Sequence, residues 1–368
     1  MRKIKLSIII GTRPEAIKLA PLILNFKKSE DFKTRIVLSG QHSFMVKQVM
    51  DLFQIKEDTN LKLMKPKQNL TFITCETLYG FEKEFEKNRP DLVIVQGDTT
   101  TAFAAALAAF YAKITIGHVE AGLRTSSIYD PYPEEVNRRL ISQLAQLHFA
   151  PTELAANNCR LSNVSGKVFM TGNTVIDALL KVGSKEIDLN IKNIDLQKNK
   201  IILATVHRRE NWGENLYNII KGLNQIVDHY KDLKLIIPMH KNPIVREPII
   251  RVLGNNENII LTEPLSYLDL VGILKNCYVV LTDSGGLQEE APTFGKPVLI
   301  LRETTERFEA VDSGTAKLVG TNPSFIFNNV KLLIENEEEY NKMSKVTNPF
   351  GDGKASLRII DAIRKYFN

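Results

Sequence analysis

Cysteine is scarce in this sequence of 368 residues, which contains three. Cys75, Cys159 and Cys277 lie far apart, and no Cys-x-x-Cys pair or Cys/His cluster accompanies them. This spacing excludes a disulfide framework and argues against a structural zinc site. We therefore expect three reduced core thiols in a cytoplasmic protein, and no metal.

Long apolar runs and a one-sided charge are also missing. The most apolar region, residues 101–119, is interrupted by Tyr111 and Lys113 and does not reach the length of a membrane span. Residues 1–10 are too short an apolar stretch for a signal peptide. Lys and Arg number 48 against 42 Asp and Glu, without a basic tract. We expect a soluble protein with neither a membrane nor a nucleic acid as partner.

Short apolar runs alternate with longer segments of helical period, which is typical of a parallel sheet with crossover helices. The runs of the first half are residues 4–10, 35–38, 92–96, 114–119 and 147–150. Those of the second half are residues 198–206, 233–237, 258–261, 278–281, 297–301 and 317–319. The chain length favours two domains. We place them at residues 1–172 and 173–353, with an amphipathic helix over 354–368 that docks on a neighbour.

The first strand is followed by Gly11-Thr12-Arg13-Pro14-Glu15. Glycine permits a tight turn there, and Pro14 suits the first position of a helix. Arg13 and Lys18 beside a helix N-terminus indicate an anion site, although a plain turn with solvated charges is the alternative. The Gly-x-Gly-x-x-Gly fingerprint is absent from this turn, which argues against a tightly bound nicotinamide cofactor.

Carboxylates follow two further strands of the first half. Asp98 comes after residues 92–96 and Glu120 after residues 114–119, so both are expected at the same edge of the sheet. Glu134 begins the next helix, four residues before Arg138. Three acids near cationic groups suit general acid–base chemistry. The alternative is structural: Asp98 caps the helix that begins at residue 99, and Glu134 compensates a helix dipole.

Histidines follow the first two strands of the second half. His207 begins the segment His-Arg-Arg-Glu-Asn, and His240 has the same placement one strand later. A histidine flanked by arginines can meet a diphosphate, although either histidine could be structural.

A glycine turn, Asp283-Ser284-Gly285-Gly286, lies between a strand and a helix that we expect to start near residue 287. Backbone N–H groups in such a turn form a phosphate nest. Glu290 is then expected in the first turn of the helix, where a carboxylate can accept a ribose hydroxyl pair. Residues 302–307 follow the next strand and are expected to line the same site.

Seven segments together resemble the non-hydrolysing UDP-N-acetylglucosamine 2-epimerases, and the resemblance runs from residue 4 to about residue 365. The segments are residues 11–15, 97–101, 118–124, 133–138, 171–174, 207–211 and 282–290. The resemblance implies a GT-B-like α/β fold: two doubly wound Rossmann-type domains with the active site in the interdomain cleft. It also implies a homodimer that needs no cofactor and whose C-terminal helix crosses back onto the first domain.

The activity implied by the resemblance is the reversible conversion of UDP-GlcNAc to UDP-ManNAc for polysaccharide biosynthesis. It proceeds by anti elimination of UDP to 2-acetamidoglucal and syn re-addition. The matching acid–base carboxylates are Asp98, Glu120 and Glu134. The residues that resemble diphosphate and orientation groups are Arg13, Lys18, Arg138 and His207, and Arg138 and His207 join the catalytic set. Further matches for substrate binding are His240, Ser284, Gly285, Gly286, Glu290 and Arg307.

The chain departs from the family pattern at Phe308, where proline is usual after Thr-Glu-Arg. Some members bind a second UDP-GlcNAc as activator through a Gln-His pair matched by Gln41 and His42. Phe44 and Lys67 replace the Gln and Arg of those members, so allosteric activation stays open. The other functions left open are a hydrolysing 2-epimerase, an epimerase of a 2,3-diacetamido uronic acid, a glycosyltransferase and a UDP-sugar sensor.

Overall fold

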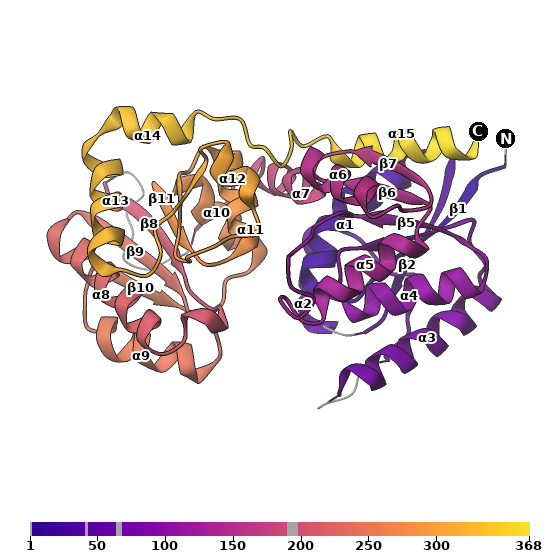
Figure 1. Ribbon diagram of the computed structural model, residues 1–368, viewed down its shortest axis with the longest axis horizontal. Helices are drawn as coiled ribbons and strands as arrows, with labels where there is room; N and C mark the ends of the chain where they lie inside the picture. The colour runs from indigo at the N-terminus through magenta and orange to yellow at the C-terminus, as the bar shows by residue number, and fades with distance from the viewer. Residues whose placement is uncertain (1, 41–42, 64–67, 190–197) are drawn as a thin grey trace. The chain divides into compact units, whose positions relative to one another are not determined.

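The computed structural model describes residues 2–40, 43–63, 68–189 and 198–368 (Figure 1). The chain forms two compact units: residues 1–178 with 350–368, called unit 1, and residues 179–349, called unit 2. The units change over inside α7 (Thr174–Gly183), a few residues beyond the domain boundary that we expected. The first turn of α7 stays with unit 1 because Asp177 accepts hydrogen bonds from the backbone N–H groups of Ala355 and Ser356 in α15 (Ala355–Phe367).

Unit 1 is built on a parallel sheet whose order, among the described residues, is β3-β2-β1-β4-β5-β6-β7. In chain order its strands are β1 (Ile4–Ile10), β2 (Phe32–Leu38), β3 (Thr59–Asn60), β4 (Leu92–Gln96), β5 (Thr115–Val119), β6 (Leu147–Ala150) and β7 (Lys167–Met170). The order reverses direction between β1 and β4, which are paired from Leu6 with Leu92 to Ile8 with Ile94. In open α/β sheets, ligands bind at the carboxyl ends of strands at such a reversal.

Helices pack against this sheet in two groups. The helices between its strands are α1 (Arg13–Lys28), α2 (Ser43–Leu52), α3 (Leu70–Lys87), α4 (Thr100–Tyr111), α5 (Glu134–Leu144) and α6 (Glu153–Leu161). Helices α3, α4 and α5 pack side by side, whereas α1 packs against α2 and against α15, which is yellow in Figure 1. Alanines make up six of the seven buried positions of α4, which lets this helix approach the sheet closely.

Unit 2 repeats the design with the strand order β10-β9-β8-β11-β12-β13 in its described residues. Its strands are β8 (Lys200–Thr205), β9 (Leu233–Pro238), β10 (Ile259–Thr262), β11 (Val279–Thr282), β12 (Val298–Ile300) and β13 (Ala316–Leu318). Its helices after α7 are η1 (Arg209–Asn211), α8 (Glu214–His229), α9 (Pro243–Leu253), α10 (Tyr267–Asn276), α11 (Gly285–Glu290), η2 (Ala291–Phe294), α12 (Phe308–Asp312), α13 (Pro323–Glu335) and α14 (Glu337–Ser344). The order reverses between β8 and β11.

Two strands of unit 1 were not expected from the sequence. β3 has two residues, too few for a periodic signal, and β7 reads Lys-Val-Phe-Met, with exposed residues at both of its ends. The expectation of three core thiols is wrong for Cys75, which is exposed on α3, whereas Cys159 and Cys277 are buried. Within the described residues, the structure contains no helix that is long and apolar enough to cross a membrane.

Candidate active site

Glu120 follows β5 directly and has a left-handed backbone, with φ +65°. This conformation is uncommon for a residue other than glycine, and such strain is concentrated at functional sites. The carboxylate accepts hydrogen bonds from Lys18 Nζ at 2.5 Å, from Gln96 Nε2 and from Asn173 Nδ2 at 3.4 Å. Because Glu120 is buried, these donors fix its orientation and compensate its charge.

Asp98 follows β4 and pairs with Arg138 of α5. Nε and Nη2 of the guanidinium both donate to Asp98 Oδ2, the first at 3.0 Å. Nη1 of Arg138 donates to Glu135 at 3.2 Å, and Asn137 of the same helix donates to the backbone carbonyl of Asp98. Two residues of α5, Arg138 and Asn137, therefore hold Asp98, and Glu135 of the same helix orients Arg138. The predicted acid and the predicted cation are thus brought together.

Glu134 begins α5 and is half-buried, one turn before Arg138. Arg13 begins α1, so Pro14 occupies the second helical position and not the first, where we expected it. The structural alternative for Asp98 is wrong, since Thr99 caps α4: its Oγ1 accepts a hydrogen bond from the N–H of Ala102 at 3.0 Å.

Two further buried groups join the strand ends of unit 1. Glu15 accepts hydrogen bonds from the N–H of Gly11 and of Thr12, and from Thr99 Oγ1 at 2.6 Å. Burial raises the pKa of Glu15, although these three bonds act in the opposite direction. His118 Nε2 donates to the carbonyl of Gly97 at 2.7 Å, and burial lowers the pKa of His118 to about 3. The hydrogen bonds of Glu15 and His118 therefore connect the carboxyl ends of β1, β4 and β5.

In unit 2, His207 follows β8 and lies against Asp283, which follows β11. Nδ1 of His207 is 3.1 Å from Asp283 Oδ1. The carboxylate of Asp283 also accepts the backbone N–H groups of His207 and Arg208 at 2.9 Å and the amide of Asn211 at 3.0 Å. Burial alone would raise the pKa of Asp283, but the bonds from His207 and its neighbours lower it. The carboxylate is thus stabilised as an anion.

His240 follows β9 and stacks on His207. Their ring centroids are 6.1 Å apart, with an angle of 23° between the planes. His240 Nδ1 accepts the backbone N–H of Asn242 at 3.2 Å. Burial and the neighbouring His207 lower the pKa of His240. The two predicted histidines therefore lie together at the carboxyl end of this sheet.

The glycine turn begins α11 directly, since this helix starts at Gly285 rather than near residue 287. Glu290 consequently ends the helix instead of lying in its first turn. Arg307 covers the turn, because a Cβ on Gly285 would lie 3.2 Å from Arg307 Cζ. Nε of Arg307 donates to Glu289 at 2.8 Å. The sequence-predicted Ser284, Gly285 and Arg307 are thus close together.

Glu306 links Arg307 to two other arginines. Its carboxylate accepts a hydrogen bond from Arg302 at 2.7 Å and one from Arg208 at 3.0 Å, and lies 3.4 Å from Arg307 Nη1. Burial opposes ionisation of Glu306, but Arg307, Arg302 and Arg208 lower its pKa to about 2. Arginines are thereby concentrated at the strand ends of unit 2, where an anion can be bound.

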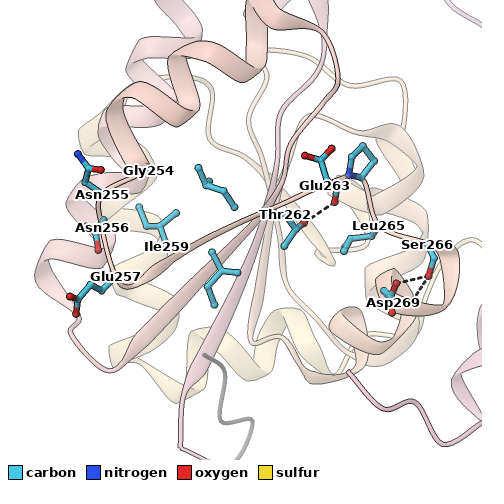
Figure 2. A pocket seen from close by; sticks show the side chains of 13 residues that line it. Gly254, Asn255, Asn256, Glu257, Ile259, Thr262, Glu263, Leu265, Ser266 and Asp269 are labelled. Carbon is cyan, nitrogen blue, oxygen red and sulfur yellow. Dashed lines mark hydrogen bonds between the residues drawn. The ribbon is translucent and has the colours of Figure 1, made fainter. Parts of the chain in front are cut away.

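A hollow of about 750 Å³ lies elsewhere in unit 2, along β10 (Figure 2). Figure 2 shows that its lining runs from Gly254 along the strand to Ser266 and Asp269, whose side chains are hydrogen-bonded to each other. None of the sequence-predicted site residues lines it. The predicted site residues lie at the strand ends around the two reversals and not in this hollow.

Sequence reasoning missed the groups that hold the predicted residues. Gln96 and Asn173 contact Glu120, and Asp283 contacts His207, although the motifs containing Asn173 and Asp283 were recognised. The position of Gln96, the last residue of a strand beside the one that carries Glu120, could have indicated its contact. Gln41, His42 and Lys67, which were compared above with the activator site of other family members, lie outside the described residues. Within those residues, no group of His, Cys, Asp and Glu side chains is arranged to hold a metal ion.

Two doubly wound units with charged side chains at both reversal points define a GT-B-like protein. The sequence profile of the UDP-N-acetylglucosamine 2-epimerase family matches residues 24–364. This chain therefore belongs to the UDP-N-acetylglucosamine 2-epimerase family.

Individual relatives agree with this assignment. UDP-N-acetylglucosamine 2-epimerase of Escherichia coli K12 is 46% identical over 370 residues, with 98% of each chain covered. That of Bacillus subtilis is 45% identical, covering 99% of this chain and 96% of its relative. The crystal structure of the Neisseria meningitidis enzyme bound to UDP-GlcNAc is 46% identical, with a TM-score of 0.90 over 98% of this chain and 100% of the other. A glycosyltransferase of kitacinnamycin, at 10% identity and TM-score 0.70, shares the fold alone.

Proposed function

We propose that this chain interconverts UDP-GlcNAc and UDP-ManNAc by eliminating and re-adding UDP, without releasing the intermediate. The observation that carries the proposal is the pair of carboxylate–cation contacts at the reversal point of unit 1, Glu120 with Lys18 and Asp98 with Arg138. Acid–base chemistry needs carboxylates whose protonation and orientation are set by their surroundings. Family membership and the UDP-GlcNAc bound to the Neisseria meningitidis relative support the substrate.

The chemistry explains why such groups are needed. The C2 proton of the sugar has no adjacent carbonyl, so simple abstraction is unfavourable. In the proposed reaction, the C1–O bond breaks and its electron pair leaves with UDP, while a carboxylate removes the C2 proton. The product is the C1=C2 double bond of 2-acetamidoglucal. The reverse step adds a UDP oxygen to C1 and a proton to the opposite face of C2.

We assign proton transfer to Asp98, Glu120 and Glu134. Arg138 and Lys18 then orient two of these carboxylates. Arg13 and His207 are proposed to stabilise the leaving diphosphate, since positive charge and N–H donors favour negative charge that develops in the transition state.

In unit 2 we assign UDP binding to the glycine turn and to the groups around it. Ser284, Gly285 and Gly286 would offer backbone N–H groups to phosphate oxygens, with Arg307 above the turn. Glu290 would accept the ribose hydroxyls, and His240 would meet the diphosphate beside His207.

The test is to separate the nucleotides that form from UDP-GlcNAc by anion-exchange chromatography. The proposal predicts an equilibrium mixture of UDP-GlcNAc and UDP-ManNAc with little free UDP. Stoichiometric UDP together with free N-acetylmannosamine would instead identify a hydrolysing enzyme.

We also propose that the protein acts in the cytoplasm as a homodimer and that its product supplies polysaccharide synthesis. Exposed aromatic side chains on two packed helices support a dimer contact: Tyr79 on α3, and Phe110 and Tyr111 on α4. Sedimentation velocity tests this arrangement. A dimer that Tyr79→Ser with Tyr111→Ser weakens is expected, whereas a wild-type monomer would contradict it.

A further inference from the structure

The motif Thr-Asp-Ser-Gly-Gly contains a buried acid that the proposed function leaves unused. Asp283 is fully buried and is the first residue of the glycine turn, directly after β11. An ionised carboxylate without solvent needs several donors. Asp283 has four such donors. They are the backbone N–H groups of His207 and Arg208, the side-chain amide of Asn211, and Nδ1 of His207.

The contact between Asp283 and His207 determines where the imidazole carries its proton. A carboxylate only accepts hydrogen bonds, so a bond at 3.1 Å requires a proton on Nδ1 of His207. This holds for the neutral ring and for the charged ring alike. The neutral ring then has its lone pair on Nε2, away from Asp283.

His240 is constrained in the opposite sense. The backbone N–H of Asn242 donates to Nδ1 of His240, so this nitrogen must hold a lone pair. The proton of His240 therefore lies on Nε2. Burial and the neighbouring His207 both disfavour the charged form of His240, in agreement with this contact.

We propose that Asp283 is a positioning residue that holds His207 with its proton on Nδ1, beside a His240 held in the opposite tautomer. One imidazole of the stacked pair then offers an acceptor at Nε2 and the other offers a donor. Nε2 of the neutral His207 ring can therefore take up a proton, and in the charged ring the same Nε2–H can donate to an oxygen of the leaving diphosphate while Nδ1 stays bonded to Asp283. This inference rests on the proposed role of His207 at the diphosphate.

A purely structural role for Asp283 is the competing explanation, because three of its bonds also hold the loop after β8. The variant Asp283→Asn separates the two roles. Its amide oxygen can keep the loop donors bound at the position of Oδ2, while its NH₂ group faces His207 Nδ1. An NH₂ group donates, so His207 must turn its Nδ1 into an acceptor and carry its proton on Nε2.

The experiment is long-range ¹H–¹⁵N NMR of the full chain labelled with ¹⁵N-histidine, at a pH at which the rings are neutral. Signals are assigned with His207→Asn and His240→Asn. We expect a proton on Nδ1 of His207 and on Nε2 of His240 in the wild type, and on Nε2 of His207 in Asp283→Asn. A wild-type His207 with its proton on Nε2 overturns the proposal, and so does an unchanged His207 in a folded Asp283→Asn protein. If that variant does not fold, the wild-type spectrum decides.

Kinetics provide the second readout. Asp283→Asn is expected to lower kcat roughly 10²-fold with KM and UDP affinity changed less than about threefold. Adding it to His207→Asn should cost little more, because the two residues act as a unit. Independent, multiplicative losses would indicate a structural role and overturn the proposal.

The matched control is Asp58→Asn, because Asp58 also accepts a backbone N–H, that of Ile36 in unit 1, whereas both histidines belong to unit 2. It should leave kcat unchanged.

A wild-type protein that shows the expected tautomers but no epimerisation would refute the proposed function and leave the tautomer assignment intact.

Discussion

Lys18 and Glu120 are 102 positions apart in the sequence, yet their side chains form an ion pair at 2.5 Å. Lys18 lies in the second turn of α1, and Glu120 leaves β5 in a left-handed conformation. Both side chains are largely removed from solvent, so neither charge can be left uncompensated without a large cost. This relationship joins the first strand–helix turn of the chain to a carboxylate that we assign to proton transfer.

Removing either partner of this pair should impair turnover more than binding. We expect Glu120→Gln and Lys18→Met each to lower kcat by roughly 10²–10⁴-fold in a UDP-ManNAc formation assay. The double variant should be little worse than the poorer single variant, because the groups act together. The matched control is Glu153→Gln, an exposed glutamate on α6 that should keep wild-type kcat. Near-normal kcat in Glu120→Gln would remove this residue from the mechanism.

Arg138 should not be replaceable by lysine. Its guanidinium bonds Asp98 through two nitrogens and Glu135 through the third, and a single ammonium group cannot reproduce this geometry. We expect Arg138→Lys to reduce kcat by about 10–100-fold, measured with saturating UDP-GlcNAc.

Arg139, the next residue of the same helix, provides the control for this substitution. It also pairs with Glu135 but is substantially exposed. Arg139→Lys should change kcat by less than about threefold. Equal losses in the two variants would mean that contact with Asp98 is not what Arg138 contributes.

Unit 1 shows how far the sequence predicts a site. The strand runs and their turns placed Asp98 and Glu120 at one sheet edge, because parallel strands that alternate with helices present their carboxyl ends together. The side-chain partners were not predictable in this way. Whether Glu120 contacts Asn173 depends on the position of β7, a strand whose short, mixed pattern gave no signal.

Unit 2 shows the same limit at its glycine turn. The motif predicted a strand, a turn and a helix, but it placed the helix start two residues late, so Glu290 was assigned to the wrong turn. Glycine is unfavourable in helices, so the sequence favoured a loop at these two positions, whereas in the structure they begin α11, with Arg307 close to Gly285. Residue type alone therefore did not predict the helix boundary.

Low pH should destabilise unit 2 by protonating Glu306. The three arginines hold the pKa of Glu306 at about 2, below its ordinary value of 4.5, although burial acts against them. A carboxyl with a lowered folded pKa stabilises the protein above its unfolded pKa, and this contribution is lost as the pH falls toward 2. Glu306→Gln should cost about 1–3 kcal/mol of unfolding free energy at neutral pH, and the difference from wild type should shrink between pH 4.5 and pH 2.

Urea unfolding followed at several pH values measures this difference. Glu338→Gln is the control, since Glu338 is highly exposed on α14 and its loss should change the unfolding free energy by less than about 0.5 kcal/mol. A Glu306→Gln effect that stays constant down to pH 2 would contradict the assigned role of the arginines.

The stability of the C-terminal helix α15 should depend on Asp177 of α7. Asp177 accepts the N–H groups of Ala355 and Ser356 and the hydroxyl of Ser356, so it caps α15 from another helix. Asp177→Ala should cost about 1–3 kcal/mol in thermal or urea unfolding, because buried donors lose their partner. Asp361→Ala, on the exposed face of α15, should cost less than about 0.5 kcal/mol. Similar losses in both variants would refute the capping role.

The central claim is that the C2 proton is exchanged while the glucal stays bound. The most direct test is proton NMR of the purified protein with UDP-GlcNAc in deuterated water, with no added metal or nicotinamide. We predict UDP-ManNAc with deuterium at C2 and little free UDP. UDP-ManNAc that keeps its original C2 proton, or accumulation of UDP with free N-acetylmannosamine, would contradict it.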